Sequence, residues 1–258
     1  MNVFYLLFFF IIGLFFGSFF CCVGLRLAKG ISFVKGHSKC DCCQHELKAK
    51  DLVPVFSYLY LRGKCRYCHK KISSLSIFIE LFTALLFALS YYSFGFSLDL
   101  VLALLLVSMA MIIFSSDLTY LIIPDEVIIF FSITLVIVQF LRLGFGEGLL
   151  ALVSGIVFFL FMFFLMKLGN HLFKKESLGG GDVKLAFIIG LVLDPFLCLV
   201  TIFLASLIAL PISLYLLFKN KEHVIPFGPF ILIGFFIIFF SKVTTSEIFT
   251  FFSSAYLI

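Results

Sequence analysis

The sequence predicts an all-α protein: a polytopic membrane helix bundle of about eight transmembrane helices, with a small cytoplasmic loop domain after the first. Hydrophobic residues make up 63% of the 258 residues and charged residues 13%, whereas soluble domains are nearer one half and one quarter. The mean hydropathy is +1.23. Apolar residues come in long unbroken runs, unlike the weak alternation of an outer-membrane barrel. The membrane helix is therefore the expected element.

Each predicted span is an apolar run near the length of about 20 residues that crosses about 30 Å of hydrocarbon. The first is expected to be retained, because no Lys or Arg precedes it and no small-residue cleavage site follows it. The shortest run, 183–193, is separated from the next by Asp194 and Pro195. The eight runs are 3–25, 75–93, 98–116, 126–141, 147–166, 183–193, 196–218 and 224–240.

The basic residues predict the orientation, since Lys and Arg accumulate in cytoplasmic loops. With eight spans, all of the 19 basic residues except Arg142 and Lys242 fall on one face. We expect this face to be cytoplasmic, which puts both chain ends outside. Omitting the 183–193 span would place Lys219 and Lys221 outside and weaken the pattern.

The loop between the first two spans has the pattern of a metal site. It holds two C-x2-C pairs separated by 21 residues, and two such pairs can complete a tetrahedral zinc site with four cysteine ligands. Disulfides are disfavoured in a cytoplasmic loop, and a loop this small needs a cross-link such as a bound metal ion to fold. Free or redox-active thiols are the alternative. Cys42 could replace Cys43 as a ligand. The predicted ligands are Cys40, Cys43, Cys65 and Cys68.

The stretch 179–184 reads Gly-Gly-Gly-Asp-Val-Lys and opens a new apolar run. A glycine costs a helix interior about 1 kcal/mol relative to Ala, but it lets the backbone approach a neighbour closely. A carboxylate at a membrane helix end is a candidate functional residue; a helix N-cap is the alternative for Asp182. The pattern G-x4-G-K-[ST] is missing from this stretch, so phosphate binding is disfavoured.

A second aspartate, Asp117, ends the third span and emerges on the same predicted face as Asp182. Two aspartates that share one water can act as general acid and base, because like charges this close do not both ionise. This is aspartyl protease chemistry; two unrelated helix ends are the alternative. Asp125 follows Pro124 and is interpreted as a helix-start carboxylate. Glu80, one turn inside the second span, either pairs with a nearby cation or serves a site.

Six short sequence motifs follow one another along most of the chain. They are Gly17-Ser18-Phe19 with Arg26-Leu27; the paired C-x2-C loop; Cys65-Arg66-Tyr67-Cys68 with Ile72-Ser73 and Glu80-Leu81; Asp117 with Ile123-Pro124-Asp125; Gly179-Gly180-Gly181-Asp182-Val183-Lys184-Leu185; and Pro226-Phe227-Gly228-Pro229. Together they resemble the type IV prepilin peptidases, the bacterial branch of the GxGD aspartyl membrane proteases.

The resemblance implies that Asp117 and Asp182 are the catalytic pair. It implies cleavage of the short leader of prepilins or pseudopilins at the cytoplasmic face, then methylation of the new N-terminal residue, commonly Phe, with S-adenosylmethionine. Cys21 and Ala28 replace the family's usual Asn and Pro near the region linked to methylation, so a peptidase without methyltransferase activity is an alternative. The supporting motif residues are Gly179, Gly181, Lys184 and Asp125.

The expected organisation is a first transmembrane helix (1–25), a zinc-binding cytoplasmic loop linked to methylation (26–74) and a transmembrane aspartyl peptidase domain (75–258). The expected location is the bacterial cytoplasmic membrane. The expected partners are pilin-like subunits of pili, secretion systems or DNA-uptake machinery and the lipid bilayer, but not nucleic acid. Two other classes are a non-catalytic zinc-bearing scaffold, which would tolerate Asp182→Asn, and a transporter, which would hold coupled acids at mid-membrane depth.

Overall fold

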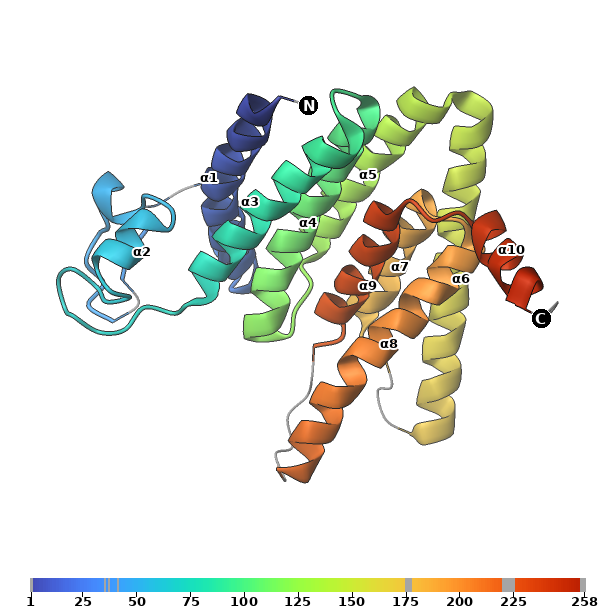
Figure 1. Cartoon of the computed structure of the whole chain (residues 1–258). Helices are drawn as coiled ribbons and strands as arrows, with labels where there is room; N and C mark the ends of the chain where they lie inside the picture. Colours follow the sequence, from blue (N-terminus) through green and yellow to red (C-terminus); the bar gives the residue numbers. More distant parts are fainter. Residues whose placement is uncertain are drawn as a thin grey trace. The chain divides into compact units, whose positions relative to one another are not determined.

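The structure is a computed structural model that describes residues 2–34, 36, 38–40, 42–174, 178–219 and 226–255. Over these ranges the elements are helices, and the only strand-like pairing is a set of isolated β-bridges (Figure 1). The all-α prediction is confirmed. The chain consists of two compact units, residues 1–127 and 128–258.

Six helices in the described ranges are long and apolar enough to cross a membrane. The other two predicted spans form shorter helices, α7 (Gly180–Val192) with 13 residues and α9 (Gly228–Ser241) with 14; the first two residues of the predicted 224–240 span lie outside the described ranges. A final helix, α10 (Thr245–Ala255), was not predicted. The six long helices are α1 (Val3–Ala28), α3 (Leu75–Phe94), α4 (Leu98–Tyr120), α5 (Asp125–Leu143), α6 (Phe145–Phe173) and α8 (Pro195–Phe218).

In the first unit, α1 packs against both α3 and α4, and the loop after α1 adds the short helices η1 (Ala49–Asp51) and α2 (Phe56–Tyr60). Three glycines of α1 allow the close approach. A Cβ at Gly13 would lie 2.5 Å from the Ala84 Cα, and one at Gly17 would lie 2.7 Å from the Glu80 Cα. A Cβ at Gly24 would clash with the Ser115 hydroxyl and the Ile112 carbonyl of α4. Small residues of this kind let membrane helices pack backbone to backbone.

We expect Gly24→Ala to destabilise the first unit by about 1–3 kcal/mol, because the methyl group must push α1 away from α4. Gly146→Ala is the matched control, since nothing lies within 4 Å of a Cβ built there and Ala is the better helix former. Thermal unfolding of both variants in the same detergent measures the difference. Equal midpoints for Gly24→Ala and wild type would contradict the close packing.

In the second unit, α7 packs against α6, and α8 packs against α9. A Cβ at Gly190 of α7 would lie 2.9 Å from the Ser154 carbonyl and 3.0 Å from the Gly155 Cα, so the two helices meet at glycine. The predicted fifth span ended at residue 166, but α6 continues through Phe173. Apolar residues at 168, 172 and 173 extend the helical face past Lys167, whose ammonium lies 5.4 Å from the Phe163 ring centroid.

Candidate functional site

Four thiols gather in the loop after α1. The Sγ atoms of Cys40, Cys43, Cys65 and Cys68 all lie within 4.8 Å of one another, and Cys40 and Cys68 are 3.8 Å apart. Tetrahedral zinc with ligand bonds of about 2.3 Å places its sulfurs about 3.8 Å apart. Cys42 is exposed and is not in this cluster. The loop could therefore hold a tetrahedral metal ion.

The two cysteine pairs lie on turns of the same construction. In the first, the Cys40 amide donates to the His45 carbonyl and the Gln44 amide donates to the Cys40 carbonyl. In the second, the Cys65 amide donates to the Lys70 carbonyl and the His69 amide to the Cys65 carbonyl. The residue after each second cysteine has a positive φ of 56°. Each turn thus presents both of its thiols to one point.

The thiols of this cluster differ in how readily they lose their protons. Hydrogen bonds from the Cys43 and Cys42 backbone lower the pKa of the Cys40 thiol to about 7. The Lys70 backbone lowers the pKa of Cys68, but burial and the neighbouring thiols outweigh it and raise that pKa to about 12. Neighbouring thiolates repel one another, so a divalent cation is what would let all four ionise together.

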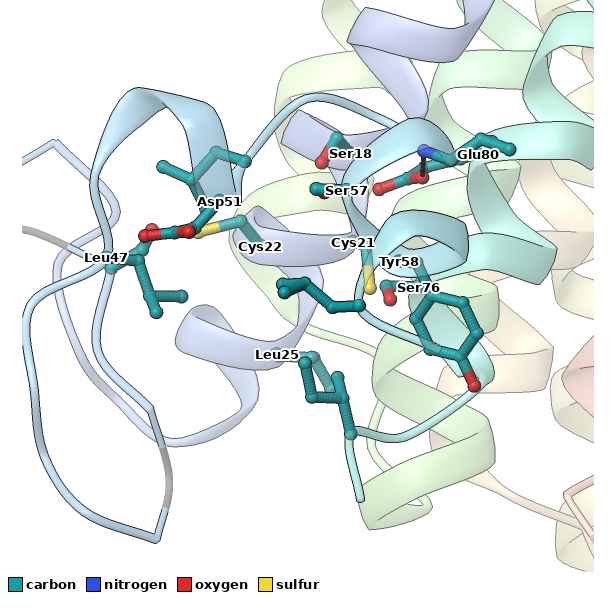
Figure 2. A pocket seen from close by; sticks show the side chains of 15 residues that line it. Ser18, Cys21, Cys22, Leu25, Leu47, Asp51, Ser57, Tyr58, Ser76 and Glu80 are labelled. Atoms are coloured by element: carbon teal, nitrogen blue, oxygen red, sulfur yellow. Dashed lines mark hydrogen bonds between the residues drawn. The ribbon is translucent and has the colours of Figure 1, made fainter. Parts of the chain in front are cut away.

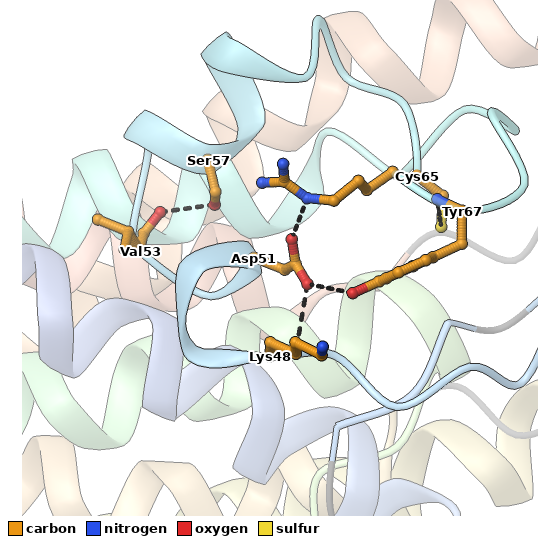
Figure 3. Close-up of polar contacts among 7 residues, drawn as sticks. Lys48, Asp51, Val53, Ser57, Cys65 and Tyr67 are labelled. Carbon is orange, nitrogen blue, oxygen red and sulfur yellow. Dashed lines mark hydrogen bonds and ion pairs between the residues drawn. The ribbon is translucent and has the colours of Figure 1, made fainter.

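A buried carboxylate, Asp51, stabilises the segment that connects the two cysteine turns (Figure 3). The Asp51 side chain is 3% exposed and accepts from Arg66 Nε at 2.6 Å, from the Tyr67 hydroxyl at 3.1 Å and from the Lys48 amide at 3.1 Å. Burial raises the pKa of Asp51, but these three donors outweigh it and hold the pKa below its usual value. The ion pair therefore stabilises the loop above about pH 4 and is lost as the pH falls through that lowered pKa.

We expect Asp51→Asn to destabilise the loop by about 1–3 kcal/mol at neutral pH, because it leaves Arg66 without its carboxylate. Glu46→Gln is the matched control: the Glu46–Lys39 pair is 3.4 Å long with both side chains about half exposed, and such pairs contribute about 0–1 kcal/mol. Hydrogen exchange of the backbone amides of residues 42–72 measures the stability of the loop in both variants. Equal protection in the two variants would contradict the role given to Asp51.

Asp117 belongs to the last turn of α4 and is 5% exposed. Its carbonyl accepts from the Leu121 amide at 2.9 Å, and Leu121 ends the helix with a left-handed conformation, φ 57°. Ser115 and Ser116 beside it are fully buried, with their hydroxyls donating to the Ile112 and Ile113 carbonyls. The helix end thus holds the carboxylate out of water, where a charge is costly.

Asp182 lies in the first turn of α7 and is 7% exposed. Gly179, rather than Asp182, is the N-cap residue, so the N-cap interpretation was wrong. A Cβ at Gly179 would lie 3.0 Å from the Asp182 Oδ2, so a larger residue there would have to shift the carboxylate slightly. Gly181 and Lys184 are half-buried beside it, whereas Asp125 is exposed at the start of α5. Asp117 belongs to the first unit and Asp182 to the second.

The first unit also contains a pocket where the loop meets α1 and α3 (Figure 2). Its volume is about 270 Å³ and its lining includes Ser18, Cys21, Asp51, Tyr58 and Glu80. A larger hollow of about 760 Å³ shares part of this lining and adds basic residues, among them Arg26 and Lys29. The sequence indicated Glu80 as a candidate site residue but not the loop that covers it, because the contact between Glu80 and the loop joins residues 25 positions apart.

In the part of the chain that the structure describes, the fold and the site define a helical protein with six helices fit to span a membrane, a four-cysteine loop and two buried aspartates at helix ends. Residues 11–94 match the model of the bacterial peptidase A24 N-terminal domain. Residues 104–214 match that of the type IV leader peptidase family. The chain belongs to the type IV leader peptidase family, which confirms the resemblance seen in its motifs.

Two similar proteins match over most of their length. The chain is 31% identical to the prepilin leader peptidase/N-methyltransferase of Bacillus subtilis over 230 residues, which are 87% of this chain and 90% of that protein. It is 31% identical to the protein of the same name from Vibrio cholerae, over 93% of this chain and 98% of that protein. No solved structure was found to match the chain.

Proposed function

We propose that the protein is a membrane-embedded aspartyl endopeptidase that removes the short leader of type IV prepilins or pseudopilins. The observation that carries this proposal is the burial of Asp117 and Asp182, each almost out of water at a helix end, in a chain of the type IV leader peptidase family. The names of the relatives support the substrate class.

The proposed chemistry uses the two carboxyl groups as a unit. One is ionised and takes a proton from a water molecule, which attacks the scissile carbonyl, while the other gives its proton to the departing amine. Gly179 would allow the Asp182 carboxylate its position, and Gly181, Lys184 and Asp125 would support the motif. The scaffold and transporter alternatives assign no bond cleavage to these acids.

A second proposed activity is methylation of the new N-terminal residue. Both relatives named above carry N-methyltransferase in their names. The first unit offers a hollow of about 760 Å³, inside the range of about 300–1,000 Å³ typical of ligand pockets. Arg26 and Lys29 line it and suit the carboxylate of S-adenosylmethionine, which when bound supplies a methyl group on a sulfonium.

We also propose zinc as the ion of the four-cysteine cluster, because four thiolates at these distances satisfy its tetrahedral preference and leave no position open for catalysis. The site would be structural. Residues 1–25, 26–74 and 75–258 would then be a first membrane helix, the zinc-binding loop linked to methylation, and the peptidase domain. Cys42, exposed beside the cluster, would not be a ligand.

The proposed location is the bacterial cytoplasmic membrane, with the zinc loop in the cytoplasm and the N-terminus outside. The six long apolar helices and the family support a multi-pass protein, and the distribution of Lys and Arg supports the orientation. Asp117 and Asp182 would then lie at the cytoplasmic edge, where a substrate can keep its apolar helix in lipid and its leader in water.

The test of the proposed function is leader removal from a prepilin encoded in the same genome. The purified protein in detergent or nanodiscs should release the leader and leave a mature N-terminus with one extra methyl group when S-adenosylmethionine is supplied. A mature N-terminus without the methyl group would leave a peptidase only. An intact prepilin after prolonged incubation would contradict the peptidase assignment itself.

A further inference from the structure

The pocket at the junction of α1, α3 and the loop contains a buried carboxylate that the peptidase chemistry does not use. Glu80 is 6% exposed. The ion pairs Lys39–Glu46 and Arg66–Asp51 do not include Glu80, which is buried without a cationic partner among the described residues. Burying a carboxylate costs several kcal/mol unless a cation and hydrogen bonds offset that cost. The pocket therefore favours a positively charged ligand.

The two acids of this pocket have different roles. Asp51 already accepts from Arg66, Tyr67 and the Lys48 amide, so its charge is matched. Glu80 accepts from the Val55 amide at 2.7 Å, a neutral donor. A carboxylate has about four lone-pair sites, so the Glu80 oxygens have room for a further donor. Figure 2 shows Glu80 beside Ser18 and Ser57, with Asp51 on the other side of the pocket.

A strained turn aims the Val55 amide at Glu80. The Phe56 amide donates to the Pro54 carbonyl at 2.6 Å, and Val55 between them has φ 61° and ψ −51°, the geometry of a rare and strained γ-turn. A β-branched residue with positive φ is a true outlier. Strain of this kind concentrates at functional sites, and here it holds one oxygen of Glu80 in place.

The motif residues of α1 position the same carboxylate from the opposite side. Gly17 lets the Glu80 backbone approach, since a Cβ there would lie 2.7 Å from the Glu80 Cα and 2.9 Å from the Thr83 hydroxyl. Ser18, next to it, lines the pocket beside Glu80 (Figure 2). The Gly-Ser pair in the first helix thus has a local purpose: Gly17 admits Glu80, and Ser18 adds a polar side chain to the pocket beside it.

We propose that Glu80 binds the α-amine of the newly formed N-terminal residue and accepts its proton during methyl transfer. This inference rests on the proposed methyltransferase activity and assigns its acceptor site. A terminal α-amine has a pKa of about 8, so it arrives mostly as an ammonium ion, the cation that the buried carboxylate favours. Removing its proton exposes the lone pair that the reaction needs.

The transfer balances with a sulfonium methyl donor as the second substrate. The amine proton passes to the Glu80 carboxylate, and the nitrogen lone pair forms a bond to the methyl carbon. The carbon–sulfur bond breaks, and its electron pair stays on sulfur as a thioether. Glu80 then returns its proton to water. General bases of this kind contribute about 10²–10⁴-fold.

The test compares wild type, Glu80→Gln and Glu80→Asp with a prepilin from the same genome, scoring leader removal and methylation in the same sample by mass spectrometry. Glu80→Gln keeps the shape of the side chain and its acceptor for the Val55 amide. We expect its methylation kcat/KM to fall by about 10²–10³-fold, with cleavage within about threefold of wild type. Glu80→Asp should lie between. Glu147→Gln, an exposed acid of α6, is the control.

A binding measurement without methyl donor separates charge recognition from structure. The probe is a synthetic peptide with the mature N-terminal sequence, either free or acetylated at its α-amine. We expect wild type to prefer the free amine by about tenfold or more and Glu80→Gln to lose this preference. If Glu80→Gln folds poorly, shown by lost cleavage and lost metal, the preference is read from Glu80→Asp, which should retain part of it.

Each outcome decides between the assignments. Wild-type methylation by Glu80→Gln, or an unchanged preference for the free amine, would overturn the role of Glu80. Cleavage by wild type with neither methylation nor amine preference would overturn both Glu80 and the methyltransferase half, and the peptidase would stand. Absence of cleavage in wild type would contradict the proposed peptidase instead.

Discussion

Asp117→Asn and Asp182→Asn are each expected to slow leader cleavage by at least about 10³-fold, which corresponds to about 4 kcal/mol of transition-state stabilisation. The amide keeps the size of each side chain but can neither take a proton from water nor give one to the leaving amine. The rate of leader release from a purified prepilin measures the loss. The protein should still insert in the membrane and keep its metal, because neither residue lies in the loop.

Two matched controls come from the same helices. Asp99 lies in the first turn of α4, whose last turn holds Asp117, and the exposed Asp194 follows the end of α7, whose first turn holds Asp182. Asp99→Asn and Asp194→Asn make the same chemical change at the opposite helix ends. We expect both to cleave within about threefold of wild type, since neither residue is fully buried and changes outside buried sites have small effects. Equal losses in all four variants would indicate helix destabilisation rather than catalysis.

Cys43→Ser and Cys65→Ser are expected to lose the bound metal and unfold the loop. Structural zinc contributes about 10–16 kcal/mol to small domains at neutral pH, far more than the Asp51–Arg66 ion pair can replace. Elemental analysis should find about one zinc per chain in wild type. The backbone amides of residues 42–72 should be protected from hydrogen exchange in wild type and should exchange fast in both variants.

Cys42→Ser is the control for the metal site, because Cys42 is adjacent to the cluster yet exposed and outside it. It should keep its zinc and its protected loop. If Cys42→Ser loses zinc and Cys43→Ser retains it, the ligand assignment is reversed. If wild type purified without chelator contains no zinc and its loop is nevertheless protected, the metal has no structural role.

The parts of this molecule that the sequence predicted well depend on short-range patterns. The four cysteines lie in two pairs with fixed spacing, and each pair is shaped by hydrogen bonds within six residues, so their spacing alone predicted the cluster. The apolar runs predicted the helices, because hydrocarbon thickness sets a minimum length. The short α7 was predicted from the glycines before it and the Asp194-Pro195 break after it.

The parts that were missed depend on contacts between distant residues. Nothing near Glu80 in the sequence indicates that the Val55 amide, 25 positions earlier, donates to it. The same holds for Asp51 and Arg66, which are 15 positions apart. The glycines of α1 are visible in the sequence, but the α3 and α4 atoms that they admit follow only from the packing of three helices.

Whether Asp117 and Asp182 are the catalytic pair is tested most directly by the mass of the pilin N-terminus recovered from cells that co-express the prepilin with wild type, Asp117→Asn or Asp182→Asn. We expect mature pilin with wild type and intact prepilin with each variant, at matched levels of membrane-inserted protein. Mature pilin in the presence of either variant would contradict the assignment of Asp117 and Asp182 as the catalytic pair.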